Sequence, residues 1–443
     1  MRIQLSDHFT YNKLLRFSIS TVLMLICTSL YSIVDGFFVS NFVGKQPFAA
    51  LNLIFPVLMG AGTIGFMVGS GGSAIVSISL GEKKPDQANE YFSMMIGTTA
   101  VIGAIVCAVC FVFTPQIARA LGASGGMLDY CVLYGRILFA AGPFFMLQIV
   151  FQSFFIAAEK PVLSLKINVI SGAANGILDF LFIAVFRWGL AGAGAATVIG
   201  QILGAVIPIF YFAKENDSLL RLRFARFQGQ VFWKACINGS SEMVSNLSSS
   251  LVNVLYNFQL MRLAGEDGVA AYGIIMYVNF VFTAAFIGYS AGTAPVTSYH
   301  YGAENHGELK NLFRKSLVLM SAGGILLTLA AELLSAPLVK IFASYDQALF
   351  ELTCTGFRIY SLAFLMMGVN IWASSFFTAL NNGGVSALIS FLRTLVFQVA
   401  AIIVLPILWE VSGVWLAIVV AEIFALIVSA VCLAALRKKY HYA

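Results

Sequence analysis

The sequence predicts an all-α polytopic membrane protein, with twelve transmembrane helices in two six-helix lobes related by a parallel internal repeat. Three observations predict this fold. Of the 443 residues, 60% are hydrophobic and only 10% are charged, whereas soluble proteins carry about 25% charged residues. Apolar runs of about 20 residues, long enough to span a bilayer, recur along the whole chain. The two halves of the chain also resemble each other in sequence.

The apolar runs follow one another with short polar stretches between them. The basic, amphipathic start "MRIQLSDHFTYNKLLRF" is not followed by a short apolar region with a cleavage site, so the first run is expected to remain as a transmembrane helix. The predicted domains are an N-terminal lobe over 1–213, a cytoplasmic linker over 214–231 and a C-terminal lobe over 232–443. The predicted spans are 14–40, 47–80, 91–113, 128–157, 162–186, 190–213, 232–261, 269–297, 314–334, 350–380, 385–408 and 412–436.

The basic residues predict the orientation. If the N-terminus lies inside, seven of the 26 Lys and Arg residues fall in outward-facing segments, which leaves 19 for the inner segments. Basic residues concentrate on the cytoplasmic side of membrane proteins, so both termini are expected in the cytoplasm and the protein in the cell membrane. The net charge of +6 comes from this distribution, and no nucleic-acid partner is expected.

The internal repeat relates the two halves by a shift of 221 or 222 residues. "SISLGEKKPDQANEYF" from Ser77 matches "SYHYGAENHGELKNLF" from Ser298, and "SFF" at Ser153 returns at Ser375. Six crossings in each half leave the second copy in the same orientation as the first. The repeats are therefore parallel and related by an axis along the membrane normal, which suits alternating access between two lobes.

Two acids lie inside apolar runs. A carboxylate at the bilayer centre costs about 2.5–3.5 kcal/mol and normally faces the protein interior or a water-filled cavity. Asp179 and Thr197 are each seven residues from the predicted outer ends of their helices, and Asp35 is five, which places all three about 8–11 Å below the outer surface. Asn175 lies one helical turn from Asp179 on the same face. These four residues are predicted to form one site if their helices are neighbours.

Such a site suits a cation. Two carboxylates close together in a low dielectric cannot both ionise cheaply, which makes a proton site, and the same oxygens can bind Na⁺. The alternative is a structural network of hydrogen bonds between helices. Phe397 and Ala401 stand opposite Asn175 and Asp179 in the second half, so the cation site is expected in the N-terminal lobe alone.

Other residues are candidates for the substrate cavity or for gating. Glu242 lies near the inner end of its span, and Glu422 lies mid-helix opposite Gln201 in the repeat. Arg393, in the middle of a span, is expected to pair with a polar neighbour. Aromatic and sulfur side chains suit a polyspecific cavity, although most of them pack helices or face lipid. The apolar candidates are Phe154, Phe155, Phe376, Phe377, Met59, Met67 and Met276.

The motifs resemble the multidrug and toxic compound extrusion (MATE) family over essentially the whole chain. "SLYSIVDGFFVSNFVG" resembles the family's first helix, "GSGGSAIVSISLGEKK" its second, and "NGILD" followed by "GAGAAT" the helix 5–6 motif of its DinF-like branch. In that branch an Asp of helix 1, an Asn and an Asp of helix 5 and a Thr of helix 6 form the cation site. The resemblance therefore implies the same four residues, Asp35, Asn175, Asp179 and Thr197.

The chain departs from the family at two points. Ser20 stands where family members often have a proline before the helix 1 acid, which puts a kink of helix 1 in doubt. Asn370 in helix 10 has no acid beside it, and Glu242 is too close to the end of helix 7 to match the NorM-like branch. A second cation site in the C-terminal lobe is not expected.

The sequence therefore predicts a secondary-active multidrug exporter that antiports H⁺ or Na⁺ against amphipathic, often cationic, organic compounds by alternating access. The expected partners are small organic substrates and membrane lipids, and the resemblance implies a monomer. No nucleotide, redox or metal motif indicates a cofactor, and the only metal expected is Na⁺ at the four-residue site. The alternatives are a lipid-linked oligosaccharide flippase of related fold and, with less support, a membrane-embedded lipid-modifying enzyme or a channel.

Overall fold

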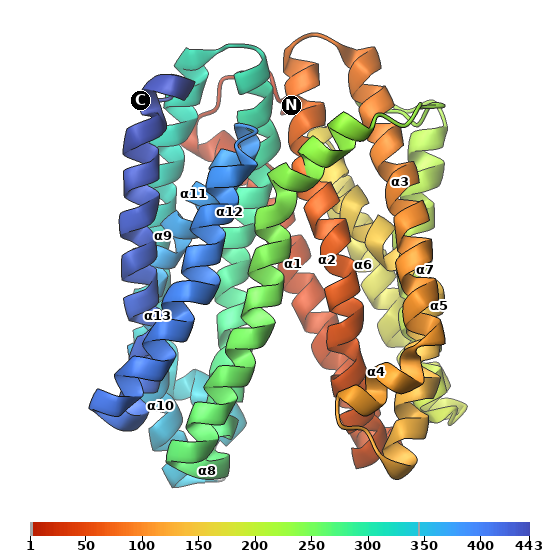
Figure 1. The fold of residues 1–443 in the computed structure, drawn as a ribbon, viewed down its shortest axis with the longest axis vertical. Helices are drawn as coiled ribbons and strands as arrows, with labels where there is room; N and C mark the ends of the chain where they lie inside the picture. Colours follow the sequence, from red (N-terminus) through yellow and green to blue (C-terminus); the bar gives the residue numbers. More distant parts are fainter. Residues whose placement is uncertain (1–2, 344–345) are drawn as a thin grey trace.

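A computed structural model describes residues 3–343 and 346–443 of the protein (Figure 1). The described residues form helices joined by turns and short loops, and three five- or six-residue π-helical turns interrupt them. The α-helices are α1 (Tyr11–Phe38), α2 (Lys45–Gly81), α3 (Pro85–Val112), α4 (Thr114–Ala120), α5 (Gly125–Ala157), α6 (Pro161–Asp179), α7 (Gly189–Ala213), α8 (Gly229–Gly302), α9 (His306–Ala343), α10 (Gln347–Ser361), α11 (Phe364–Ala379), α12 (Gly383–Phe391) and α13 (Phe397–Tyr440). The π-turns are η1 (Val39–Val43), η2 (Phe180–Val185) and η3 (Leu392–Val396).

The helices confirm the polytopic membrane fold. Within the described residues, nine helices are long and apolar enough to cross a bilayer, or ten if the bent pair α10–α11 is one span. Two of these, α8 with 74 residues and the α12–α13 segment with 58, are about twice the length of one span. The backbone leaves the helical region at Gly265 in α8 and at Trp409 and Glu410 in α13. Counting the bent pair as one span and the two arms of each long element separately gives twelve spans in the described residues, as predicted.

The breaks have a local cause. Gly265 has φ 61° and ψ −148°, a conformation open almost only to glycine because it has no Cβ.

The short helix α4, between the third and fourth spans, is not among the predicted elements. It starts at Thr114 with Pro115 in its first turn, where proline is tolerated because the first amides of a helix lack partners within it.

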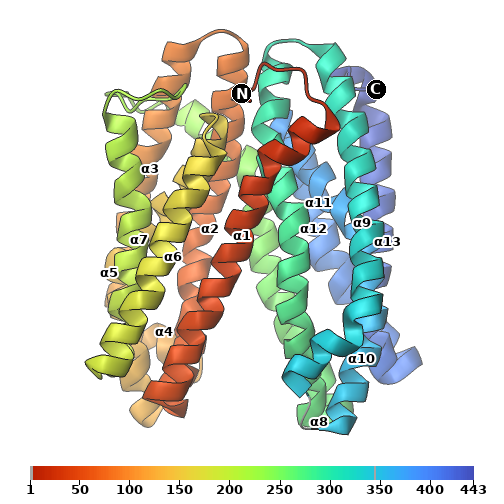
Figure 2. The same cartoon turned by 180° about the vertical axis from the view of Figure 1, so that it is seen from behind.

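Two bundles stand side by side, with α2 to α7 in one and most of α8 to α13 in the other (Figures 1 and 2). Both chain termini lie at the same end of the molecule (Figure 1). We call this the inner end, following the orientation that the basic residues predict, and the opposite end the outer end. α2 and the first arm of α8 lie close together near the inner end and diverge toward the outer end (Figure 1).

Glycines allow the two bundles to meet at the inner end. A Cβ on Gly71 of α2 would lie 2.0 Å from the carbonyl oxygen of Ala235 in α8, and a Cβ on Gly239 would lie 1.9 Å from that of Met67. α1 also crosses α8, where a Cβ on Gly292 would lie 3.0 Å from Cα of Ser18. The closest contact between the lobes is therefore backbone against backbone, as small residues permit in membrane helices.

Candidate functional site

The two intramembrane acids meet in the N-terminal bundle, which consists of α2 to α7 and the outer part of α1, packed against α6. Asp35 is on the last part of α1, and Asp179 is the final residue of α6. α1 packs directly against α6. The ring of Tyr31 on α1 lies against Gly172 of α6, where a Cβ would be only 2.5 Å from the ring. The carboxyl groups of Asp35 and Asp179 lie next to each other, close enough for each to act on the other's charge.

α7 brings the remaining predicted residues to the same place. It packs against α6, and a Cβ on Gly200 would lie 3.3 Å from Cβ of Asn175. Thr197 lies three residues before Gly200, on the same face of α7. The structure thus brings the helices of Asp35, Asn175, Asp179 and Thr197 together.

Tyr134 of α5 belongs to this cluster, although the sequence analysis did not select it. Its side chain is fully buried, and its hydroxyl faces Thr197 and the two carboxylates. Nothing in the sequence marks it among 16 tyrosines. Only the packing of α5 against α7 brings its ring beside Gly194, where a Cβ would lie 3.4 Å from the ring.

The cluster is rich in buried polar atoms that lack hydrogen-bond partners among the described residues, five oxygens and one amide nitrogen. Within the described part of the chain, no hydrogen-bond partner exists for Oδ1 of Asp35, both carboxylate oxygens of Asp179, Nδ2 of Asn175, Oγ1 of Thr197 or the Tyr134 hydroxyl. A buried polar group without a partner costs about 1–3 kcal/mol. Carboxylate, hydroxyl and amide oxygens are also the ligands that hard cations prefer. The arrangement therefore suits a group that supplies positive charge or hydrogen-bond donors, such as H⁺ or Na⁺.

Both acid-bearing helices end in a π-turn. η1 starts four residues after Asp35, and η2 starts directly after Asp179. The two π-turns are in contact with each other. π-turns inside helices occur frequently at functional sites because they leave backbone groups and side chains in non-helical directions.

The polar residues of the C-terminal bundle form a separate network. Glu422 of α13 is fully buried, with its Oε1 2.8 Å from Nε of Arg393 and its Oε2 2.7 Å from Nδ2 of Asn370. Arg393 thus has the polar partner that was expected for it. Glu242 of α8 is half-buried and lies close enough to Arg393 for an electrostatic attraction between the two side chains. These two acids share one basic side chain and do not form a second carboxylate pair.

The aromatic candidates lie in the hydrophobic cores of their bundles. Phe154 packs edge-on against Phe92 at 4.9 Å, and Phe376 packs against Trp372 at 5.0 Å. Phe377 is buried as well, and Phe155 is buried beside a small cavity between α5, α6 and α7. The three methionine candidates are half-buried, Met59 and Met67 on α2 and Met276 on α8. A cavity of about 330 Å³ lies between α9, α11 and α13 and is lined by other side chains, among them Phe313 and Arg437.

A protein-family model matches the chain twice. The family is MatE, and the matched residues are 21–181 and 243–404, one copy in each half. Multidrug export protein MepA of Staphylococcus aureus (strain bovine RF122 / ET3-1) is 24% identical over 418 residues, which cover 93% of this chain and 91% of that protein. The MepA of Staphylococcus haemolyticus (strain JCSC1435) is 24% identical over 368 residues, 81% of this chain and 80% of that protein.

Solved structures share the fold. A MATE transporter in complex with MaL6 superposes with a TM-score of 0.92 at 20% identity, covering 97% of this chain and 98% of its own. The outward-facing conformation of a multidrug resistance MATE family transporter gives a TM-score of 0.91 at 21% identity, with 97% and 98% covered. A MOP superfamily transporter from Pyrococcus furiosus, reported to have a binding pocket of reverse polarity, gives a TM-score of 0.90 at 20% identity. The match covers 98% of this chain and 97% of that transporter. The double match of the family model covers more than half of the chain, which therefore belongs to the MATE family of membrane transporters.

Proposed function

We propose that this transporter is a secondary-active exporter of amphipathic, often cationic, organic compounds, driven by antiport of H⁺ or Na⁺ and belonging to the DinF-like branch. The observation that carries the proposal is the carboxylate pair Asp35–Asp179 inside one bundle. Neither carboxyl group has a basic side chain among its described interaction partners. A cation is the natural partner for such a pair.

The contacts of α1 suggest how cation binding acts on transport. Its outer part carries Asp35, and its inner part packs against α8 of the other bundle, where a Cβ on Gly288 would lie 2.6 Å from Cα of Val22. A cation that joins Asp35 to Asp179 favours one packing of α1 on α6. The same rigid helix passes this preference to the contact between the bundles, and alternating access requires such a link.

The substrate class rests on the relatives. The similar proteins from two Staphylococcus species are named multidrug export proteins. A flippase for a pyrophosphate-linked lipid would need unpaired basic groups in the membrane. Arg393, the basic residue near mid-membrane, is ion-paired with Glu422. This pairing favours the exporter over the flippase.

The test is efflux of a fluorescent organic cation from proteoliposomes, with a pH gradient and a Na⁺ gradient imposed separately. We expect one of the two gradients to drive efflux by the wild type, and Asp35→Asn and Asp179→Asn to reduce it to the level of protein-free vesicles. Asp129→Asn is the matched control, because Asp129 is an exposed acid of the same bundle, and it should keep wild-type efflux.

The possible results separate the hypotheses. Wild-type efflux in both site variants would reject the cation site and leave a structural network in its place. No gradient-driven efflux of any tested cation by the wild type would reject the exporter and favour the flippase.

A further inference from the structure

The buried face of α6 carries a continuous polar stripe. Ser164, Asn168, Ser171, Asn175 and Asp179 follow each other at spacings of three or four residues, and all five are at most 6% exposed. Such spacing puts them on one face of the helix. The stripe runs about 22 Å along the axis, from near the inner end of α6 to the carboxylate pair. Polar side chains at a helix interface in a membrane normally hydrogen-bond to the neighbouring helix, so the partners of this stripe indicate whether it serves packing.

The polar groups of this stripe are only partly paired. Oδ1 of Asn168 accepts a hydrogen bond of 3.3 Å from Thr28, and the Tyr31 hydroxyl faces the same amide. Within residues 3–343 and 346–443, Nδ2 of Asn168, Oγ of Ser171 and Nδ2 of Asn175 have no hydrogen-bond partner, nor does Oε1 of Gln201 on α7. Each such group destabilises the fold unless water or an ion satisfies it.

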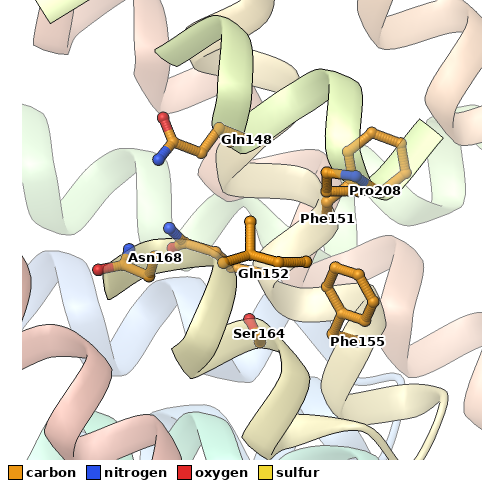
Figure 3. A pocket seen from close by; sticks show the side chains of 9 residues that line it. Gln148, Phe151, Gln152, Phe155, Ser164, Asn168 and Pro208 are labelled. Atoms are coloured by element: carbon orange, nitrogen blue, oxygen red, sulfur yellow. The ribbon is translucent and has the colours of Figure 1, made fainter. Parts of the chain in front are cut away.

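A small cavity opens from the inner part of the stripe. It is lined from α5, α6 and α7, by Gln148 and Gln152, by Ser164 and Asn168, and by Gly204. Figure 3 shows the polar side chains on one side of this cavity and the rings of Phe155 and Pro208 on the other. Its volume of about 10 Å³ is the space that one water molecule needs, and its lining offers the two to four polar partners that a buried water needs.

The internal repeat provides a comparison within the same molecule. A shift of 222 residues puts Gln148 on Asn370, Gln152 on Ser374, Ser164 on Ser386 and Asn168 on Ser390. In the C-terminal bundle, serines replace Gln152 and Asn168, and the serines hydrogen-bond directly, with Oγ of Ser374 2.9 Å from Oγ of Ser386 and 2.8 Å from Oγ of Ser390. Asn370 donates to Glu422. The same repeat position is thus closed by direct hydrogen bonds in one bundle and lined by longer amide side chains around a cavity in the other.

We propose that the polar stripe of α6 and its cavity form a water-holding passage, through which a proton leaves the Asp35–Asp179 pair toward the inner end. The inference rests on the proposed proton-coupled function. One proton moves from the carboxyl pair to the oxygen of a neighbouring water, and each water passes a proton to the next until one is released at the inner surface. The passage lies within the N-terminal bundle, beside the contact of α6 with α1, where Thr28 donates to Asn168. It is restricted to the bundle that carries the carboxylate pair.

The test uses two variants that make the cavity apolar without adding charge. Gln152→Leu and Asn168→Leu keep the approximate side-chain volume and remove the polar atoms. Val169→Leu is the matched control, because Val169 is on the same helix and is 44% exposed, outside the buried polar stripe. Ser386→Ala controls for the equivalent position in the other bundle. The full-length protein is reconstituted in proteoliposomes, with the fluorescent organic cation as the probe.

Two readouts separate the passage from the cation site. The first is displacement of the bound fluorescent cation from purified protein by acid, which reports protonation at equilibrium. The second is the rate of efflux driven by a pH gradient. We expect both variants to keep the acid-induced displacement and to slow efflux about tenfold, equivalent to about 1.4 kcal/mol in the barrier. Both controls should keep both properties, whereas Asp179→Asn should lose both.

Each other result contradicts the passage. An unchanged efflux rate in either Leu variant would show that protons leave by another route. Loss of the acid-induced displacement together with transport would show that the stripe supports the cation site and does not conduct. Absence of pH-driven efflux in the wild type would reject the proposed proton coupling itself, and this outcome is distinguishable because it requires no variant.

Discussion

At the scale of single residues, the two bundles treat buried charge differently. Asp35 and Asp179 face each other with no basic partner among the described residues. Glu422 instead has both Arg393 and Asn370 within hydrogen-bonding distance. A paired and hydrogen-bonded charge stays in one protonation state, whereas an unbalanced pair exchanges its cation. The Asp35–Asp179 pair therefore suits ion coupling, whereas the Glu422 contacts suit a fixed connection between α11, η3 and α13.

The Glu422–Arg393 pair predicts a stability effect. Arg393→Gln leaves a buried carboxylate without its counter-charge, and removal of one partner from a buried pair costs about 3–5 kcal/mol. We expect a lower unfolding temperature for the detergent-purified variant, measured by intrinsic fluorescence. The double variant Arg393→Met/Glu422→Leu removes both charges and should recover most of the loss. Arg262→Gln, at an exposed position, is the control, and a single variant as stable as this control would contradict a structural role for the pair.

At the scale of elements, the segment before α1 connects the two bundles at the inner end. The amide of Leu5 donates to Oε1 of Glu159 at 2.6 Å, at the end of α5. The amide of Phe9 donates to Oε1 of Glu308 at 2.8 Å, and Nδ1 of His8 lies 2.7 Å from Oε2 of that residue, in the first turn of α9. Leu5 and Phe9 are fully buried. The segment thus holds an acid from each bundle and stabilises the closed inner end.

Removal of one of these acids should release the segment. Glu308→Ala deletes the acceptor of Phe9 and of Asn311, which donates at 2.7 Å. Hydrogen bonds to a charged acceptor contribute about 1.5–3 kcal/mol, so amide hydrogen exchange over residues 4–9 should accelerate by about ten- to a hundredfold. Glu215→Ala, which changes an exposed acid of the linker, should leave this exchange unchanged. Equal protection in the two variants would show that apolar packing alone holds the segment.

At the scale of the whole molecule, the linker between the bundles is bound mainly to the N-terminal one. The amide of Arg221 donates to Oδ1 of Asn89 at 2.7 Å, and the Arg223 guanidinium lies 2.7 Å from Asp86, both on α3. The Phe224 side chain is 95% exposed. The contact between α2 and α8, and not the covalent connection, is therefore expected to hold the bundles together.

Cleavage of the linker tests this expectation. A protease site inserted between Phe224 and Ala225 should allow complete cleavage of the purified protein. The two fragments should co-elute in size-exclusion chromatography, and cleaved proteoliposomes should retain efflux, because the glycine contacts at Gly71 and Gly239 are untouched. The uncleaved insertion variant is the control. Separation of the fragments would show that the linker holds the lobes in register.

The sequence by itself determined the properties that depend on short windows of the chain. The twelve spans follow from apolar runs, because each helix must satisfy its own backbone in lipid and expose an apolar surface. The repeat follows from a constant shift, and the depth of Asp35, Asn175, Asp179 and Thr197 follows from the rise of a helix. The family model confirms the MATE family that these motifs indicated.

Only the tertiary structure decided which faces of the helices meet. It places Tyr134 beside the carboxylate pair and pairs Glu422 with Arg393. It also places π-turns directly after the two helices that carry Asp35 and Asp179. It also enclosed Phe154 and Phe376 in hydrophobic cores. The physical reason is that hydropathy measures transfer of a segment into lipid, and in lipid every apolar face is equally acceptable. The choice among faces depends on close packing and on polar contacts between residues far apart in the chain, which no local window contains.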